Sequence, residues 1–105
     1  MGSTIIKNIG MILSGDIEHP VLDGDTIVIT DKKIAAVGNS SVADGVEADK
    51  VIDAAGATVA PGFFDTHVHT TIGDYAHRQF ASNFIEGELH GGVTTIISAG
   101  ECHMP

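Results

Sequence analysis

The chain has 105 residues, enough for one small domain or for part of a larger protein. Hydrophobic residues make up 43% and charged residues 18%, a composition typical of folded rather than disordered proteins. Fourteen acidic against five basic residues give a formal net charge of −9, which argues against nucleic-acid binding and against a basic membrane-surface site. A single cysteine excludes a disulfide within the chain, and the first twelve residues do not resemble a targeting signal, so we expect a cytoplasmic protein.

The first sixty residues predict short β-strands separated by turns. Asp31 and Lys32 form a two-residue link between two β-branched or apolar segments, which indicates a hairpin. The polar segment 39–50 predicts a loop. Strands are predicted over 4–9, 26–30, 33–38, 51–53 and 57–60. Several short strands at this spacing favour a small sheet or sandwich.

The pattern changes after Pro61 and Gly62. Segment 63–69 predicts a buried strand, and 93–98 predicts a second one. Between them, apolar residues recur at helical spacing from about residue 77 to 90, and Gly91 and Gly92 supply the helix stop. A strand, a helix and a strand in about 35 residues form a βαβ unit, whose two strands should be parallel and adjacent.

His67 and His69 are the residues that most suggest chemistry. Side chains alternate along a strand, so both imidazoles point to one side, roughly 6.6–7 Å apart along the chain. From that spacing they can converge on one metal ion at about 2.0–2.1 Å each. A His-x-His pair is by itself a weak signal, because surface or hydrogen-bonded histidines produce it too.

The longer string at 60–69, Ala-Pro-Gly-Phe-Phe-Asp-Thr-His-Val-His, resembles the signature of the amidohydrolase superfamily. Segments 33–38 and 51–56 resemble that family's sandwich strands, and 90–95 resembles the entry to its second barrel strand. The resemblance implies a mixed α/β fold in two parts. Residues 1–60 would form the N-terminal part of a small β-sandwich domain. Residues 61–105 would form the first strand, helix and second strand of an incomplete (β/α)8 barrel.

Metal-dependent hydrolysis of an amide is the activity that the resemblance implies. His67 and His69 would bind a divalent metal, zinc or iron, in a centre that the resemblance implies to be binuclear, and a metal-bound hydroxide would attack the amide carbon. The catalytic Asp and the remaining metal ligands would lie beyond Pro105, so no catalytic residue is expected among these 105. We expect the chain to be the N-terminal part of a longer enzyme and to be inactive alone.

Within the superfamily the chain most resembles the enamidases, on segments 4–10, 14–17, 65–69, 73–76, 90–95 and 97–100. Enamidases hydrolyse a cyclic enamide, 6-oxo-1,4,5,6-tetrahydronicotinate, in nicotinate degradation. The alternatives are a dihydropyrimidinase-like or dihydroorotase-like cyclic amidohydrolase and an isoaspartyl-dipeptidase-like enzyme. If 105 residues were the full chain, a non-catalytic β-rich assembly module would be the alternative.

Residues after the first barrel strand are candidates for substrate binding. Asp74, Tyr75 and Arg78 would lie on the rim where such barrels bind substrate, and Arg78 could pair with a substrate carboxylate. The competing interpretation is a solvated first turn of a helix. Asp65, two residues before His67, is expected to hydrogen-bond backbone or orient a ligand rather than to bind metal. The expected partners are a small cyclic amide and further copies of the same chain, with neither nucleic acid nor a membrane.

Overall fold

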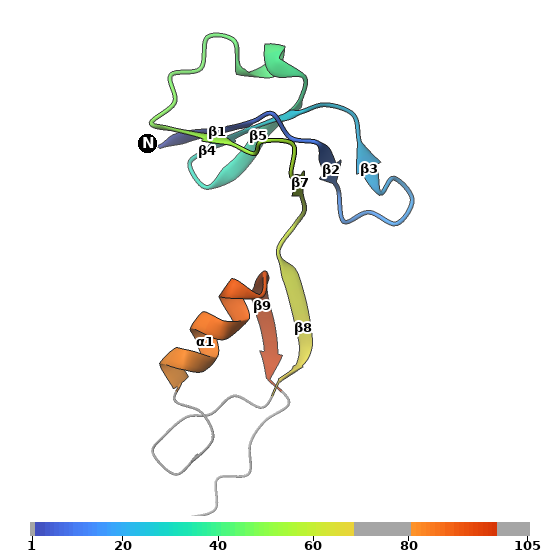
Figure 1. Cartoon of the computed structure of the whole chain (residues 1–105), viewed down its shortest axis with the longest axis vertical. Helices are drawn as coiled ribbons and strands as arrows, with labels where there is room; N and C mark the ends of the chain where they lie inside the picture. The colour runs from blue at the N-terminus through green and yellow to red at the C-terminus, as the bar shows by residue number, and fades with distance from the viewer. Residues whose placement is uncertain (1, 69–80, 99–105) are drawn as a thin grey trace, which may run out of the picture. The chain divides into compact units, whose positions relative to one another are not determined.

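The computed structural model describes residues 2–68 and 81–98. By its internal contacts the chain divides into two compact units, Met1–Pro61 and Gly62–Pro105. Most of the described elements are strands, and the described residues contain one α-helix, α1 (Ala81–His90), in the second unit (Figure 1).

Four strands of the first unit form a mixed sheet in the order β5-β4-β1-β6. β1 pairs antiparallel with β4 and parallel with β6. Isoleucine, valine and threonine recur in these strands, and their branched side chains favour extended backbone. The strands are β1 (Ser3–Lys7), β4 (Thr26–Thr30), β5 (Lys33–Gly38) and β6 (Lys50–Asp53).

The hairpin between β4 and β5 is confirmed. Asp31 and Lys32 have φ angles of 50° and 67°, so two consecutive turn residues are left-handed. This is the type I′ geometry, whose twist matches the right-handed twist of the flanking strands. The predicted bounds 26–30 and 33–38 agree with β4 and β5.

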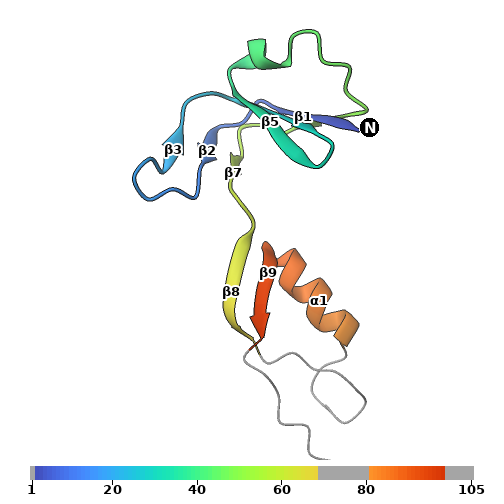
Figure 2. The ribbon, with the colours of Figure 1, turned by 180° about the vertical axis from the view of Figure 1, so that it is seen from behind.

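Three shorter strands form a second sheet in the order β3-β2-β7, seen from the opposite side in Figure 2. β2 is Met11–Leu13, β3 is Val21–Leu22 and β7 is Thr58–Val59. Only the β7 region was predicted, as segment 57–60. β2 and β3 are too short to produce a sequence period, and β2 gains its parallel partner β7 from more than forty residues further along the chain.

Two other differences from the sequence-based expectations have local causes. β1 ends at Lys7 rather than at residue 9, because Asn8 has a φ of 56° and leaves the extended conformation. The predicted loop 39–50 contains a short 3-10 helix, η1 (Ser40–Ala43). The side chain of Asn39 accepts a 3.0 Å hydrogen bond from the Ser41 N–H and so starts this helix.

Both sheets of the first unit contribute to one apolar core. Ile12 from β2 and Ile27 from β4 are buried together with Ile9, which lies between β1 and β2. Burying each such side chain contributes about 1.5–3 kcal/mol. Partly buried residues that pack against this cluster are Ile6, Leu22, Ile29, Val37, Ala54 and Val59. The two sheets therefore share one apolar core.

The second unit contains β8 (Phe63–Val68), α1 and β9 (Val93–Ser98). β8 and β9 are parallel and adjacent, which confirms the predicted βαβ arrangement. The predicted helix 77–90 is seen from Ala81 onward, and 77–80 lies outside the described residues. No helix in the described part of the chain has the length and apolar character needed to cross a membrane.

Asp53 fastens the turn after β6 to the end of β1. Its Oδ1 accepts hydrogen bonds from the Ala55 N–H at 2.8 Å and from Asn8 Nδ2 at 3.1 Å. The Ala55 and Asn8 hydrogen bonds, with a smaller contribution from the charge of Lys7, hold the pKa of the Asp53 carboxyl below its usual value of 3.8. The ionised carboxylate is thus favoured in the folded state.

We predict that Asp53→Ala lowers the melting temperature at neutral pH and that this difference shrinks in acid. Because folding depresses the pKa of Asp53, its contribution to stability is present above the usual value of 3.8 and is lost as the pH falls through the lower folded value. Thermal unfolding between pH 7 and pH 2 measures this. Glu47→Ala, at an exposed residue in the loop that precedes β6, is the control and should leave the melting curve unchanged. A difference between wild type and Asp53→Ala that is independent of pH would contradict the prediction.

Candidate metal centre

The start of β8 is fixed by very close packing against β9. A methyl group on Gly62 would overlap Oγ1 and Cγ2 of Thr94, and would lie 2.7 Å from its Cβ. The Phe63 N–H donates a 2.9 Å hydrogen bond to the Gly92 carbonyl. Only glycine at residue 62 allows β8 to approach β9 this closely.

The turn that precedes β9 is a glycine cap of α1. Gly92 has a φ of 89°, and its N–H donates to the Leu89 carbonyl at 3.0 Å. The left-handed residue satisfies a carbonyl of the last helical turn and reverses the chain into β9. The predicted helix stop at Gly91 and Gly92 is confirmed.

The pairing of β8 with β9 is irregular at the candidate metal ligand. Asp65 lies opposite Ile96 and Val68 lies opposite Ser98, so three steps along β8 match two along β9. The extra residue falls in the stretch of Thr66 and His67. Such a bulge bends a strand and changes the direction in which a side chain leaves it.

The Asp65 carboxylate stabilises this irregular stretch. Its Oδ1 accepts a hydrogen bond from the His67 N–H at 3.2 Å, and the Asp65 residue is half-buried. The bulge interrupts the ladder here. The Asp65 side chain therefore supplies the hydrogen-bond acceptor that a backbone carbonyl of a neighbouring strand provides in a regular sheet. The expectation that Asp65 hydrogen-bonds backbone is confirmed.

His67 and Val68 differ strongly in exposure. Val68 is only 5% exposed, whereas His67 is exposed. The strand therefore buries the apolar side chain between the two predicted ligands and presents the imidazole of His67 at the surface of the unit. An exposed imidazole at the end of a parallel strand has the donor chemistry of a ligand for a divalent transition metal.

Of the residues predicted for the site, the structure describes His67 alone. His69, Asp74, Tyr75 and Arg78 lie outside the described residues. Across residues 2–68 and 81–98, no three or more His, Cys, Asp or Glu side chains come together in a group that could hold a metal ion. The described part of the chain thus contributes one candidate ligand and the strand that carries it.

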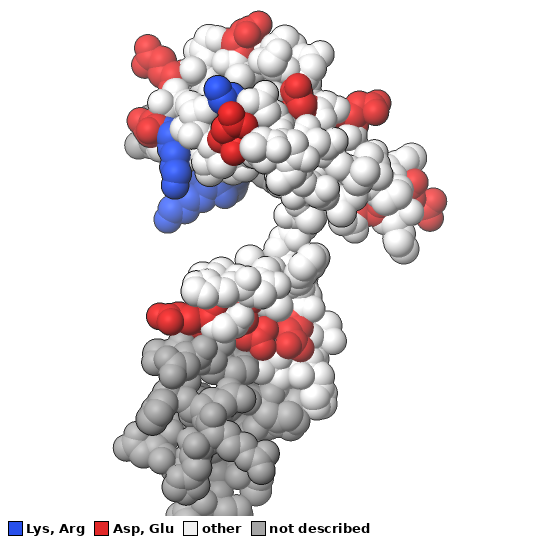
Figure 3. Space-filling view, viewed as in Figure 1, with Lys and Arg blue, Asp and Glu red and all other residues white. Residues whose placement is uncertain are grey.

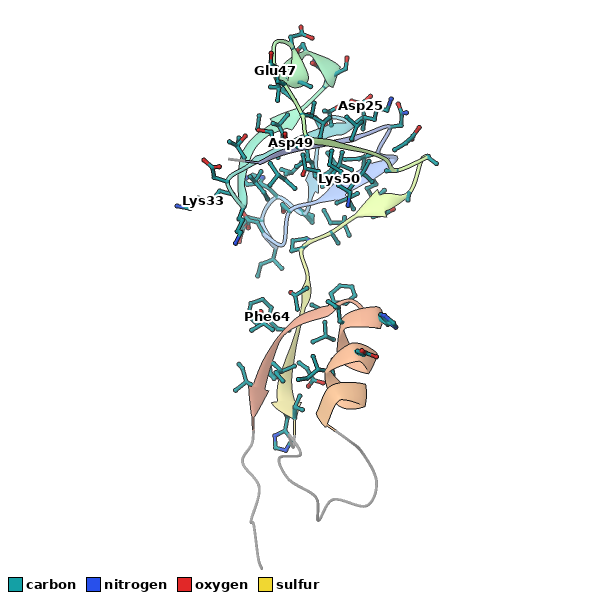
Figure 4. All side chains as sticks on the ribbon, turned by 90° about the vertical axis from the view of Figure 1, so that its left-hand side faces the viewer. Asp25, Lys33, Glu47, Asp49, Lys50 and Phe64 are labelled. Carbon is teal, nitrogen blue, oxygen red and sulfur yellow. The ribbon has the colours of Figure 1, made fainter. Side chains whose placement is uncertain are left out.

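Large apolar side chains and carboxylates share the surface of the second unit. Phe64 of β8 is 66% exposed and stands out from the ribbon in Figure 4. Ile85 and Leu89 of α1 are also exposed. Figure 3 shows acidic side chains on this unit, and on the first unit it shows them scattered rather than gathered in one patch on the visible face.

A backbone hydrogen bond of Asp65 was predicted, but the bulge in β8 was not. The spacing of Asp65 two residues before His67 is the signal for the hydrogen bond, because Asp side chains commonly accept from the backbone N–H two residues on. The contact between Gly62 and Thr94 had no such signal, since it joins residues on two different strands.

Comparison with known proteins extends along the whole chain. The chain is 57% identical over 105 residues to enamidase from Eubacterium barkeri, covering 100% of this chain and 27% of that protein. It is 37% identical over 99 residues to imidazolonepropionase from Paenarthrobacter aurescens, covering 92% of this chain and 24% of that protein. No family model matches the chain. The chain thus spans about a quarter of the length of these relatives.

Solved structures agree with the sequence comparison. An enamidase structure described as that of an amidohydrolase superfamily member matches with a TM-score of 0.86 and 57% identity, over 99% of this chain and 27% of that one. The L-hydantoinase (dihydropyrimidinase) from Arthrobacter aurescens matches with a TM-score of 0.71 and 35% identity, over 93% of this chain and 20% of that one. The described fold therefore corresponds to one part of larger proteins of this superfamily.

We predict that Gly62→Ala destabilises the second unit, whereas Gly87→Ala does not. The methyl group at residue 62 must displace Thr94 or separate β8 from β9, a cost of about 1–3 kcal/mol. At Gly87 a methyl group meets nothing within 4 Å, and alanine is the better helix former by about 1 kcal/mol. Hydrogen exchange of the β9 amides measures the effect. Equal protection of β9 in both variants would contradict the proposed close packing.

Proposed function

Since this chain is related along its whole length to the amidohydrolase superfamily, we propose that it forms part of a metal-dependent hydrolase that cleaves the C–N bond of a cyclic amide. The observation that carries the proposal is the 57% identity with enamidase across all 105 residues. The chain's own geometry supports it, because a parallel strand presents His67 at an irregularity that Asp65 stabilises.

We propose that 1–60 is the N-terminal part of the small β-sandwich domain and that 61–105 begins a (β/α)8 barrel. Two parallel strands and one helix cannot enclose a core by themselves. The exposed side chains of Phe63, Phe64, Ile85 and Leu89 are the apolar surface that further strands and helices would cover. In such a barrel, catalytic groups gather at the carboxyl ends of the strands, which is where β8 carries His67.

His67 and His69 are the residues that would hold a divalent metal ion. Solved metal-dependent hydrolases from Pyrococcus furiosus and Pyrococcus horikoshii match this chain with 28% and 27% identity, which supports the choice of a metal. Two imidazoles are fewer than the three protein ligands of a catalytic zinc site, so other residues of the protein must complete a site for zinc or iron, mononuclear or binuclear. When bound, the metal would polarise the substrate carbonyl and lower the pKa of a water molecule.

The substrate that we propose is a cyclic enamide such as 6-oxo-1,4,5,6-tetrahydronicotinate, whose hydrolysis releases ammonia. Identity with enamidase supports this choice over the others. The match to L-hydantoinase at a TM-score of 0.71 favours a dihydropyrimidine or hydantoin as the second candidate class. Asp74, Tyr75 and Arg78 are proposed to contact the substrate, with Arg78 pairing its carboxylate. Cytoplasmic location and homo-oligomeric assembly stay predictions.

We predict that His67→Ala and His69→Ala each lower bound metal and reduce ammonia release from the cyclic enamide by at least about a hundredfold, since each removes an imidazole ligand. Metal content is measured by plasma emission spectroscopy on the intact protein, and turnover by an ammonia assay. His19→Ala, in a loop of the first unit, is the matched control and should change neither quantity. A full metal complement with wild-type turnover in either strand variant would refute the site, and would leave a non-catalytic assembly role as the alternative.

We predict that Arg78→Ala raises KM for a carboxylated lactam by about tenfold or more and changes KM for the matching uncharged lactam little. A guanidinium paired with a carboxylate contributes charge-assisted hydrogen bonds that the uncharged substrate cannot form. Steady-state kinetics on the two substrates make the comparison. Equal changes in KM for both would show that Arg78 does not recognise the carboxylate.

A further inference from the structure

We propose that Asp65 is a positioning residue for the metal centre, because its carboxylate holds the backbone of β8 in the bulged conformation that directs the His67 imidazole. The inference rests on the proposed function, in which His67 is a metal ligand. It assigns to Asp65 a role through the main chain and not a bond to the metal.

The hydrogen bond between His67 and Asp65 lies in the irregular part of β8. The His67 N–H donates to Asp65 Oδ1 at 3.2 Å, in the stretch where β8 has one residue more than β9 between the Ile96 and Ser98 partners. In a regular ladder, hydrogen bonds between the two strands would by themselves fix the backbone conformation of this stretch. Here the Asp65 carboxylate accepts a hydrogen bond in place of part of that pairing. It therefore fixes the backbone conformation at His67, and with it the direction of the His67 side chain.

The residues at the two ends of this irregular stretch are partly or fully buried. Asp65 is half-buried, and Val68, on the other side of the bulge, is buried. The two residues that flank Thr66 and His67 are therefore both held by the fold, Asp65 by its pairing opposite Ile96 and Val68 by its burial. Fixing both ends of a short irregular segment restricts the directions available to the imidazole between them.

The same local hydrogen bond occurs at two other Asp residues, for which no metal role is proposed. Asp53 Oδ1 accepts from the Ala55 N–H at 2.8 Å, and Asp16 Oδ1 accepts from the Glu18 N–H at 2.9 Å. All three join an Asp side chain to the backbone two residues on. Asp53 thus provides a matched control, because its loss removes an equivalent bond from the first unit and leaves β8 untouched.

Asparagine separates positioning from direct ligation. Its side-chain oxygen can accept from the His67 N–H as the Asp65 carboxylate does, but it carries no charge and is a poor metal ligand. Alanine has no acceptor at all. If Asp65 acts through the backbone, Asp65→Asn should bind Zn²⁺ as the wild type does and Asp65→Ala should bind it more weakly. If Asp65 binds the metal directly or acts through its charge, both variants should bind Zn²⁺ more weakly.

The experiment measures Zn²⁺ affinity of the intact protein after its metal has been removed with a chelator, by competition with a chromophoric chelator at neutral pH. We expect Asp65→Ala to weaken Zn²⁺ binding by about 10–100-fold, the usual effect of losing a group that orients a ligand. Asp65→Asn should stay within about threefold of wild type. Asp53→Ala should lower the melting temperature without changing Zn²⁺ affinity. All titrations are made well below each variant's melting temperature, with far-UV circular dichroism to confirm the fold.

Three results would overturn the proposal. Unchanged Zn²⁺ affinity in Asp65→Ala, with His67→Ala weakened, would remove the role of Asp65 while leaving the metal site intact. Equal weakening in Asp65→Asn and Asp65→Ala would assign Asp65 to direct ligation or to its charge. Wild-type Zn²⁺ affinity in His67→Ala would refute the proposed function itself, and the positioning role with it.

Discussion

The parallel pairing of β8 with β9 is the contact on which the candidate metal centre depends. Gly62 brings the start of β8 against Thr94, and the Phe63 N–H bonds to the carbonyl of Gly92. These contacts fix where β8 begins, and the pairing with β9 becomes irregular at Thr66 and His67. The strand that carries the proposed ligand His67 is thus held by close packing at its start, and a side-chain hydrogen bond from the His67 N–H to Asp65 lies near its other end.

The first unit is stabilised in a different way. Its two sheets share a small core around Ile9, Ile12 and Ile27, and side-chain hydrogen bonds fasten the turns at its edges. Asp53 and Asn39 act in this way, each accepting from a backbone N–H two residues on. In the second unit Asp65 makes the same kind of bond, and there it lies next to the residue expected to do chemistry.

Sequence patterns predicted the elements whose signals are local. The hairpin at Asp31 and Lys32, the cap at Gly92 and the parallel pair on either side of α1 all follow from turn residues and hydrophobic periods within a few positions. β2 and β3 were missed because each has only two or three residues and acquires its strand conformation from partners elsewhere in the chain. The metal-ligand prediction stands on a motif, and of its two histidines only His67 falls among the described residues.

The sequence by itself determined the hairpin turn at Asp31 and Lys32, the glycine cap of α1 and the order of strand, helix and strand in the second unit. It did so because each of these depends on the conformational preferences of neighbouring residues. Only the tertiary structure decided the order of strands in the sheets, the contact of Gly62 with Thr94 and the bulge at Thr66 and His67. Those features arise from pairing between segments distant in the chain, and register between two strands is a property of neither strand alone.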